Sequence, residues 1–273
     1  MNAIVNHKAI LGGLLQYTEA SEHSLALVQH ARDLANRSFG GVVPVPTSAN
    51  IREWVSVVQG LKAEFTNGDT TRGLMEELIR VRYQHISGNC QLWYDVPRLR
   101  IIPPSEVFRV GVSYNYQPHR DTWYGAPQEQ VNHWMAVSGV GFDSTFFIAP
   151  SLFHTPVENS SVEFDLGQWN REFRNRAVDQ VAGENRPHPH PRGEVPDDLI
   201  IRQIMPTGAD VAFSGHHIHG SCENVSSHVR VSIDFRVSSP SWRDLAPENV
   251  DCSATGDYYS EMRLHPGWQK ELL

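Results

Sequence analysis

The chain has 273 residues, of which 40 % are hydrophobic and 20 % are charged, and its formal net charge is −8. This composition is typical of a globular protein, and the length favours one large core, so we expect residues 1–273 to form a single domain. The acidic balance argues against nucleic acid as a partner, because phosphate binding needs clustered lysine and arginine. The sequence has no apolar run long enough to span a membrane and no signal-peptide pattern at its start, so we expect a cytoplasmic protein without a membrane partner.

Apolar residues recur at helical spacing in three segments of the first 95 residues, which predicts a supporting helical layer over 1–95. The first helix is expected over 21–36, before Gly40-Gly41. The second begins behind Asn50, which is expected to form a capping box with Glu53, and ends at Asn67-Gly68. The apolar positions are Leu25, Val28, Ala31 and Leu34, then Ile51, Trp54, Val55, Val58, Leu61 and Phe65, then Leu74, Met75, Leu78 and Val81. Such stripes predict packing faces.

From about Leu99 the pattern changes to short segments rich in β-branched and aromatic residues, separated by proline and glycine turns. The predicted strands are 107–116, 130–137, 144–149, 210–214 and 229–237. Together with the helical layer they predict a mostly β fold with helices, in which residues 96–240 form a jelly roll, or double-stranded β-helix. The prolines within 176–196 predict an inserted lid or mobile loop. We expect the aromatic extension, 241–273, to pack back on the body.

Two strings predict one metal site. The first is His119-Arg120-Asp121, and the second begins at His219 and ends at Arg230. Two imidazoles and one carboxylate are the ligand set of non-heme Fe(II) oxygenases, which leave coordination positions open. On a strand, residues 119 and 121 point the same way, so both can reach one ion. His-x-Asp alone is weak evidence for a metal site in a chain with 14 histidines. The second string strengthens this prediction.

The second string has His219-Gly220-Ser221, then Asn224, Ser226 and Arg230. With the first, it resembles the Fe(II)/2-oxoglutarate-dependent dioxygenases of the phytanoyl-CoA hydroxylase type, loosely over residues 99–237. This resemblance implies iron ligands at His119, Asp121 and His219, with Arg230 gripping the distal carboxylate of 2-oxoglutarate through its guanidinium fork. The spacing to Arg230 favours His219 over the neighbouring His216 and His217.

Further site residues are expected from their positions. Ser232 shares a strand face with Arg230, and Asn132 and Trp134 share a face of their own strand, so these three are expected around 2-oxoglutarate, although a tryptophan there is also an ordinary core residue. The expected substrate contacts are Trp123 and Tyr124, just after the first ligands, His217, on the same face as His219, and His188 in the proline-rich loop. Surface exposure is the alternative for His188.

The resemblance implies that O2 and 2-oxoglutarate are consumed, that succinate and CO2 are released, and that a C–H bond of a small molecule is oxidised. Hydroxylation is the expected outcome, desaturation and oxidative cyclisation stay open, and the carboxylate of Asp121 disfavours halogenation. Residues 119–125 also resemble members from antibiotic and sugar-modifying pathways. The acidic balance favours a polar, amine-bearing natural-product intermediate over a coenzyme A thioester. The sequence leaves the oligomeric state open.

A second hypothesis from another class is a cupin-type protein that binds or isomerises a sugar with a metal and without O2 chemistry. Arg230 discriminates between the two, because without 2-oxoglutarate its guanidinium has no obvious anion to hold.

Overall fold

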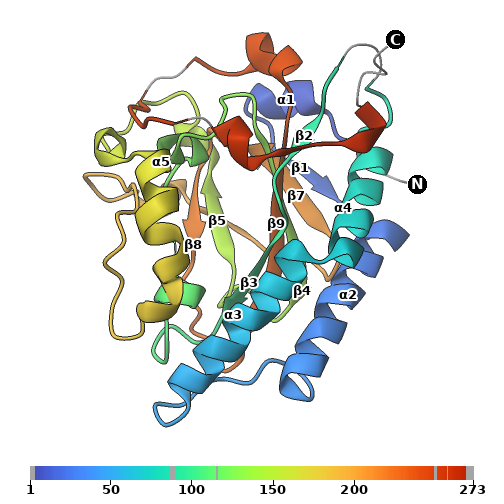
Figure 1. Cartoon of the computed structure of the whole chain (residues 1–273). Helices are drawn as coiled ribbons and strands as arrows, with labels where there is room; N and C mark the ends of the chain where they lie inside the picture. Colours follow the sequence, from blue (N-terminus) through green and yellow to red (C-terminus); the bar gives the residue numbers. More distant parts are fainter. Residues whose placement is uncertain (1–3, 87–89, 115, 249–250, 257, 269–273) are drawn as a thin grey trace.

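The computed structural model describes residues 4–86, 90–114, 116–248, 251–256 and 258–268. Within them, antiparallel strands form two sheets that helices cover from outside (Figure 1). The strands are β1 (Gln16–Thr18), β2 (Trp93–Tyr94), β3 (Arg98–Ile102), β4 (Val131–Ser138), β5 (Phe146–Ala149), β6 (Ile201–Gln203), β7 (Asp210–Ser214), β8 (Ile218–Ser221), β9 (Arg230–Ser238) and β10 (Arg263–Leu264). The helices are α1 (His7–Leu11), α2 (Glu22–Phe39), α3 (Ile51–Asn67), α4 (Asp69–Arg82) and α5 (Leu166–Gln168). The fold is therefore mixed helix and antiparallel sheet.

The large sheet has the strand order β1-β7-β4-β9-β2-β10, with β3 also paired to β9, and the small sheet has the order β6-β5-β8. Successive side chains of β4 and β9 point to opposite faces of the large sheet. Val231, Ile233 and Phe235 of β9 pack with the helices in the main core. The opposite face packs on the small sheet, where Trp134 of β4 meets Phe146 of β5 with ring centroids 4.4 Å apart. Asn132 of β4 and the polar residues of β9 thus face the space between the sheets, whereas His133 of β4 faces the helices.

The three predicted helices are confirmed as α2, α3 and α4, which lie along one side of the large sheet (Figure 1). α2 begins after Ser21, which forms a reciprocal capping box with Ser24. The capping box predicted at Asn50 is wrong. The side chain of Asn50 instead accepts hydrogen bonds from the backbone N–H and the hydroxyl of Thr47, at 2.7 and 3.0 Å, so it closes the preceding turn.

Four predicted strands are confirmed as β4, β5, β7 and β9, whereas the strand predicted over 107–116 is wrong. Its described residues form turns and a short 3-10 helix, Gly111–Ser113. Gly111 has a φ of +57°, and a Cβ there would lie 2.3 Å from the carbonyl oxygen of Ala177. The chain therefore turns tightly against a distant segment at this point, and this tertiary contact overrides the alternating sequence.

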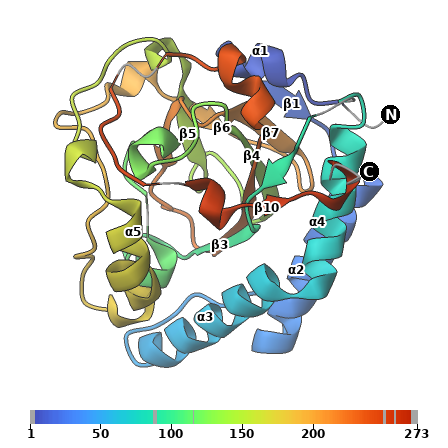
Figure 2. The same cartoon turned by 45° about the horizontal axis from the view of Figure 1, so that its top comes forward.

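Residues 166–179 form a helical run that the sequence did not predict. α5 continues into a π-helical turn, Trp169–Phe173, and a 3-10 segment, Arg174–Asp179. Figure 2 shows this run on the side of the molecule away from α4. The proline-rich segment that follows is fastened at its far end, where Ser160 N–H donates to the carbonyl of His190 at 3.0 Å and residues 159 and 191 form an antiparallel bridge.

The C-terminal segment packs back on the body, as predicted for its described residues. β10 pairs with β2, and Trp268 Nε1 donates to the carbonyl oxygen of Ile86 at 3.1 Å. Tyr258 is buried and lies against the same side of the molecule as the helical run. In the part of the chain that the structure describes, no helix combines the length and the apolar character needed to cross a bilayer.

Candidate metal centre

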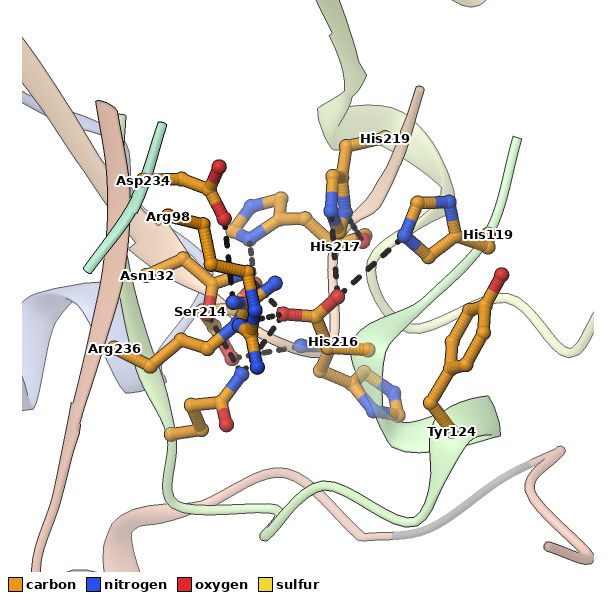
Figure 3. A network of polar contacts seen from close by, with 12 residues as sticks. Arg98, His119, Tyr124, Asn132, Ser214, His216, His217, His219, Asp234 and Arg236 are labelled. Carbon is orange, nitrogen blue, oxygen red and sulfur yellow. Dashed lines mark hydrogen bonds and ion pairs between the residues drawn. The ribbon is translucent and has the colours of Figure 1, made fainter. Parts of the chain in front are cut away.

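The side chains of His119, Asp121 and His219 converge between the two sheets. One ligand atom from each lies within 4.8 Å of the others. Nε2 of His119 and Nε2 of His219 are each 3.5 Å from Oδ1 of Asp121. Figure 3 shows the two histidine rings directed toward the same point, with Arg236 and Asn132 on the other side. Two imidazole nitrogens and one carboxylate oxygen can thus bind one ion from a single side.

The backbone sets this arrangement. Residues 119 and 219 form an antiparallel bridge with two reciprocal N–H···O hydrogen bonds of 2.9 Å, which brings the two rings side by side. The sequence had suggested that residues 119 and 121 lie on one strand, but the structure does not place Asp121 in a strand. Asp121 opens a 3-10 helix, Asp121–Tyr124, and its N–H donates to the carbonyl of Gly215 at 2.9 Å. Both ligands of the first string still reach the same point.

Hydrogen bonds fix the tautomers of both histidines. Nδ1 of His119 lies 2.8 Å from the carbonyl oxygen of Gln117, and Nδ1 of His219 lies 3.0 Å from that of His217. A carbonyl only accepts, so each Nδ1 carries the proton and each Nε2 presents a lone pair to the centre. Burial, followed by the neighbouring His119, lowers the pKa of His219 to about 4, which keeps this imidazole neutral at physiological pH.

The carboxylate of Asp121 is held from its second oxygen. Oδ2 accepts hydrogen bonds from Gln130 Nε2 and Asn132 Nδ2, both at 2.9 Å, and from Arg236 Nε at 3.1 Å. Burial alone would raise the pKa of Asp121, but its interactions with His119, His219 and Asn132 lower it to about 2. Oδ1 is therefore left to face the histidines as part of an ionised group.

Arg230 is a buried guanidinium without a carboxylate partner among the described residues. Its Nη1 donates to the carbonyl oxygen of Thr145 at 2.6 Å, while its Nε has no hydrogen-bond partner. Burial lowers the pKa of Arg230 to about 10. Because a buried, incompletely bonded cation is costly, this arrangement favours an anion as its missing partner. The family resemblance assigns that role to the distal carboxylate of 2-oxoglutarate.

A cavity of about 250 Å³ contains the three candidate ligands and Arg230. Of the residues expected around the cofactor, Trp134 and Asn132 line it. The guanidinium of Arg230 lies 6.0 Å from the centroid of the Trp134 ring. Ser232 is fully buried between Arg230 and Asp234 along β9, and it does not line the cavity. Its hydroxyl has no hydrogen-bond partner in the described structure.

Two of the four expected substrate contacts, Tyr124 and His188, lie at the cavity or directly behind its wall. Tyr124 lines the cavity. His188 stands behind it, stacked on Tyr114 with ring centroids 4.1 Å apart and with Nδ1 3.1 Å from the hydroxyl of Tyr124. His188 is 9 % exposed, so surface exposure is wrong for this residue.

The placement expected for Trp123 and His217 is wrong. Trp123 is fully buried on the far side of its 3-10 helix, where Nε1 donates to Asp251 at 2.9 Å. His217 packs on Phe153, and its Nε2 lies 3.1 Å from the carbonyl oxygen of Gly13. Neither residue lines the cavity.

Arg236 and the charged residues linked to it, which face the metal centre from the large sheet, were not predicted from the sequence. Arg236 connects Asp121 with Asp95 and Asp234, with Nη1 at 3.2 Å from each of the last two. Arg100 forms a bidentate pair with Asp234 at 2.5 and 3.0 Å. A signal for this cluster was present, because positions 230, 232, 234 and 236 alternate with Val, Ile and Phe along one strand.

Comparisons with known proteins support the fold. No protein-family model matches the sequence, and no curated protein matches it. EvdO2 from Micromonospora carbonacea var. aurantiaca, solved with 2-oxoglutarate bound, aligns with a TM-score of 0.50 and 10 % identity over 87 % of this chain and 91 % of EvdO2. The chain thus shares its fold with a protein that binds 2-oxoglutarate.

Two further solved structures align at lower TM-scores. ThoJ, described as a non-heme monooxygenase, has a TM-score of 0.43 and 13 % identity over 83 % of this chain and 74 % of ThoJ. SnoN, described as a non-heme alpha ketoglutarate dependent epimerase from nogalamycin biosynthesis, has a TM-score of 0.44 and 12 % identity over 98 % of both chains.

Proposed function

We propose that this protein is an Fe(II)/2-oxoglutarate-dependent oxygenase that oxidises a C–H bond of a small molecule in natural-product biosynthesis. The observation that carries the proposal is one cavity in which a His-Asp-His group lies beside a buried arginine without an anionic partner in the described structure. The residues fit the implied groups, because both Nε2 atoms are free to bind iron and Arg230 offers the fork that a carboxylate needs. We place the chain among the phytanoyl-CoA hydroxylase-like proteins and its two sheets in a double-stranded β-helix.

Each residue of the centre has a task in this proposal. His119, Asp121 and His219 hold the iron, and Gln130, Asn132 and Arg236 keep the carboxylate of Asp121 ionised and oriented. Arg230 orients 2-oxoglutarate, with Trp134 closing the same side of the cavity. When bound, iron and 2-oxoglutarate supply the oxidising chemistry with O2 as co-substrate. The aromatic walls around Tyr124 and Phe164 position the substrate and exclude water.

Arg230 also separates this proposal from a cupin-type protein without O2 chemistry, in which the buried guanidinium would have no role. The test is anaerobic titration of Fe(II) and 2-oxoglutarate, followed by visible absorption. We expect a weak charge-transfer band in the wild type that is lost in Arg230→Ala. Arg109→Ala is the matched control, because Arg109 is exposed and paired with Glu223 at 2.9 Å away from the cavity. A wild type without the band, or an unchanged band in Arg230→Ala, contradicts the proposal.

A further inference from the structure

A second cavity, of about 610 Å³, adjoins the metal cavity. The residues that line both are Arg98, Arg100, Ile102, Tyr114, Tyr116, Arg174 and Arg186. The wall farther from the metal centre is α3, which contributes Gln59, Lys62 and Thr66. The two cavities thus share a wall, and a ligand that occupied both would have its reacting end at the metal centre and its other end beside α3.

Positive charge dominates the walls of this second cavity. Lys62 and five arginines line it, whereas Glu261 is its only acidic residue among those described. Four of the arginines are paired with carboxylates: Arg98 with Asp95, Arg100 with Asp234, Arg174 with Glu261 and Arg186 with Glu184. Two of these carboxylates, Asp95 and Asp234, are also shared with Arg236. The local charge is therefore opposite in sign to the net charge of the chain.

Lys62 is a half-buried cation on these walls that has no acidic partner among the described residues. Nζ donates a short hydrogen bond to the carbonyl oxygen of Val112, and Lys62 forms no ion pair with any described residue. Burial and then repulsion from Arg100 lower the pKa of Lys62 to about 7, although Asp234 acts in the opposite direction. An oxyanion bound at Nζ would counteract the burial and the repulsion from Arg100, because it offers an opposite charge and a hydrogen-bond acceptor.

We propose that the second cavity binds an anionic group of the substrate, a carboxylate or a phosphate ester, with Lys62 as its direct partner. This rests on the proposed function, because the remainder of the substrate then lies at the metal centre. The aromatic rings between the two sites, Tyr114, Tyr116 and Trp169, suit an apolar or ring-shaped body. Arg100 already stacks on Tyr116, with its guanidinium 4.8 Å from the ring centroid, so an amine would meet like charge here.

The anion at Lys62 is distinct from 2-oxoglutarate. Lys62 does not line the metal cavity, and Arg230 does not line the second cavity. The two cations lie on different elements, α3 and β9, and β3 passes between the sites they serve. In the proposed function 2-oxoglutarate would fill the place beside Arg230, so a different anionic group is needed beside Lys62.

The experiment measures protection of Lys62 in the metal-free protein. Limited acetylation with acetic anhydride, read out by mass spectrometry, compares Lys62 with Lys8, an exposed lysine on α1. Four probes share one ring and differ in the head group: benzoate, phenyl phosphate, benzamide and benzylamine. We expect benzoate or phenyl phosphate to slow acetylation of Lys62 and not of Lys8, and the better of the two identifies the anionic group. Benzamide and benzylamine are expected to give no protection.

A second measurement uses calorimetry with the protective anion. Lys62→Gln is expected to bind it about tenfold more weakly or worse, whereas Lys8→Gln binds it as the wild type does. Protection by benzamide or benzylamine equal to that by the anions overturns the proposal, as does an absence of protection by both anions. Protection of Lys62 by 2-oxoglutarate that persists in Arg230→Ala also overturns it, since Lys62 would then hold the co-substrate.

These outcomes separate the two proposals. If Lys62 is protected but the wild type gives no charge-transfer band with Fe(II) and 2-oxoglutarate, the anion site stands and the oxygenase function fails. If the band forms in the wild type and in Lys62→Gln while neither anion protects Lys62, the oxygenase function stands and the anion site fails.

Discussion

Single residues behind the candidate ligands fix the carboxylate of Asp121. Arg236 contacts Asp121 on the oxygen that faces away from the histidines, and it does so while tied to Asp95 and Asp234. Groups that orient a ligating carboxylate typically affect metal affinity by about 10- to 100-fold. The three donors on Oδ2 of Asp121 therefore belong to the centre as much as its ligands do.

We expect Asp121→Ala and His219→Ala to abolish high-affinity metal binding while the protein stays folded. Each ligand comes from a short segment whose backbone is fixed by neighbouring strands, so removing a side chain leaves the fold in place. Titration with Mn(II), followed by electron paramagnetic resonance, measures the loss, and circular dichroism checks the fold. Retention of metal affinity in either variant removes that residue from the centre.

Arg236→Met is expected to weaken Mn(II) binding by about 10-fold or more without abolishing it. The substitution removes one donor and one positive charge from the neighbourhood of Asp121, so the carboxylate becomes easier to protonate and freer to rotate. Arg243→Met, on an exposed arginine near the C-terminal side, serves as the control. If the dissociation constant for Mn(II) is unchanged in Arg236→Met, the contact between Arg236 and Asp121 does not contribute to metal affinity.

The sequence could predict the candidate ligands because their choice depends on residue type and order, and not on side-chain orientation. His119, Asp121 and His219 could be chosen from residue type and order, and the structure brings them together. Trp123 and His217 were misplaced because both inferences assumed that neighbouring residues follow strand alternation. A 3-10 helix at Asp121–Tyr124 and a tight turn before β8 rotate these side chains away from the cavity. Local backbone geometry of this kind is set by tertiary contacts.

At the scale of elements, a buried polar cluster joins α4 to the large sheet. Arg82, at the end of α4, donates to Asp210 of β7 at 2.5 Å, and both side chains are almost inaccessible to solvent. His133 of β4 lies 2.9 Å from the same carboxylate through Nδ1, and its Nε2 lies 2.8 Å from the hydroxyl of Tyr83. Burial would raise the pKa of Asp210, but Arg82 and His133 outweigh it and lower the pKa.

Asp210→Asn is expected to reduce the free energy of unfolding at pH 7 by about 3–5 kcal/mol, since it leaves Arg82 buried without its counterion. The pKa of Asp210 is lower in the folded than in the unfolded protein. Its stabilising contribution is therefore present above the unfolded value near 3.8 and decreases as the pH falls through the folded value. Urea unfolding at pH 7 and pH 3 tests this, because the difference between wild type and variant should shrink at low pH. A difference that grows at pH 3 contradicts the sign.

Elements with strong local patterns were predictable, and elements defined by distant contacts were not. α2, α3 and α4 follow from their apolar stripes, and β4, β5, β7 and β9 from β-branched and aromatic content. The run from Leu166 to Asp179 has no apolar stripe at helical spacing. Its position depends on distant contacts, such as the hydrogen bond of 2.7 Å between Asn170 and Glu261. β2 and β10 contain two residues each, too few for any periodicity.

At the scale of the whole molecule, the helical layer and the metal centre lie on opposite faces of the large sheet. α4 contributes no residue to either cavity, and Leu78 on its inner face is 1 % exposed. α4 therefore stabilises the sheet without lining either cavity, whereas α3 lines the second cavity. The proposal of one domain over residues 1–273 rests on this shared use of the large sheet.

We expect Leu78→Ala to lower the free energy of unfolding by about 2–5 kcal/mol, because it leaves a void in the main core. The affinity of the folded protein for Mn(II) and 2-oxoglutarate should stay within about twofold of the wild type, which is within the usual effect of a distant substitution. Chemical denaturation and calorimetry at a temperature well below unfolding measure the two quantities. A large loss of affinity together with stability would show that α4 shapes the site directly.

The charge of the whole chain differs in sign from the charge of the cavity walls. A net charge of −8 favoured an amine-bearing substrate, yet the walls near the metal centre are rich in arginine. Net charge sums over the surface, whereas a ligand meets only the few side chains that face it. The acidic residues that balance these arginines, such as Asp95 and Asp234, lie behind them.

The reciprocal main-chain hydrogen bonds between residues 119 and 219 have a consequence for which ion is loaded. They hold the backbones of the two histidines side by side, and the hydrogen bonds on Oδ2 of Asp121 hold the third donor, so all three donors are placed before an ion binds. A frame of this kind does not discriminate strongly among first-row divalent ions, whose intrinsic affinities follow a common order. In the proposed oxygenase, the choice of ferrous ion would then depend on its supply in the cell, and purification in the presence of nickel or zinc is expected to replace it.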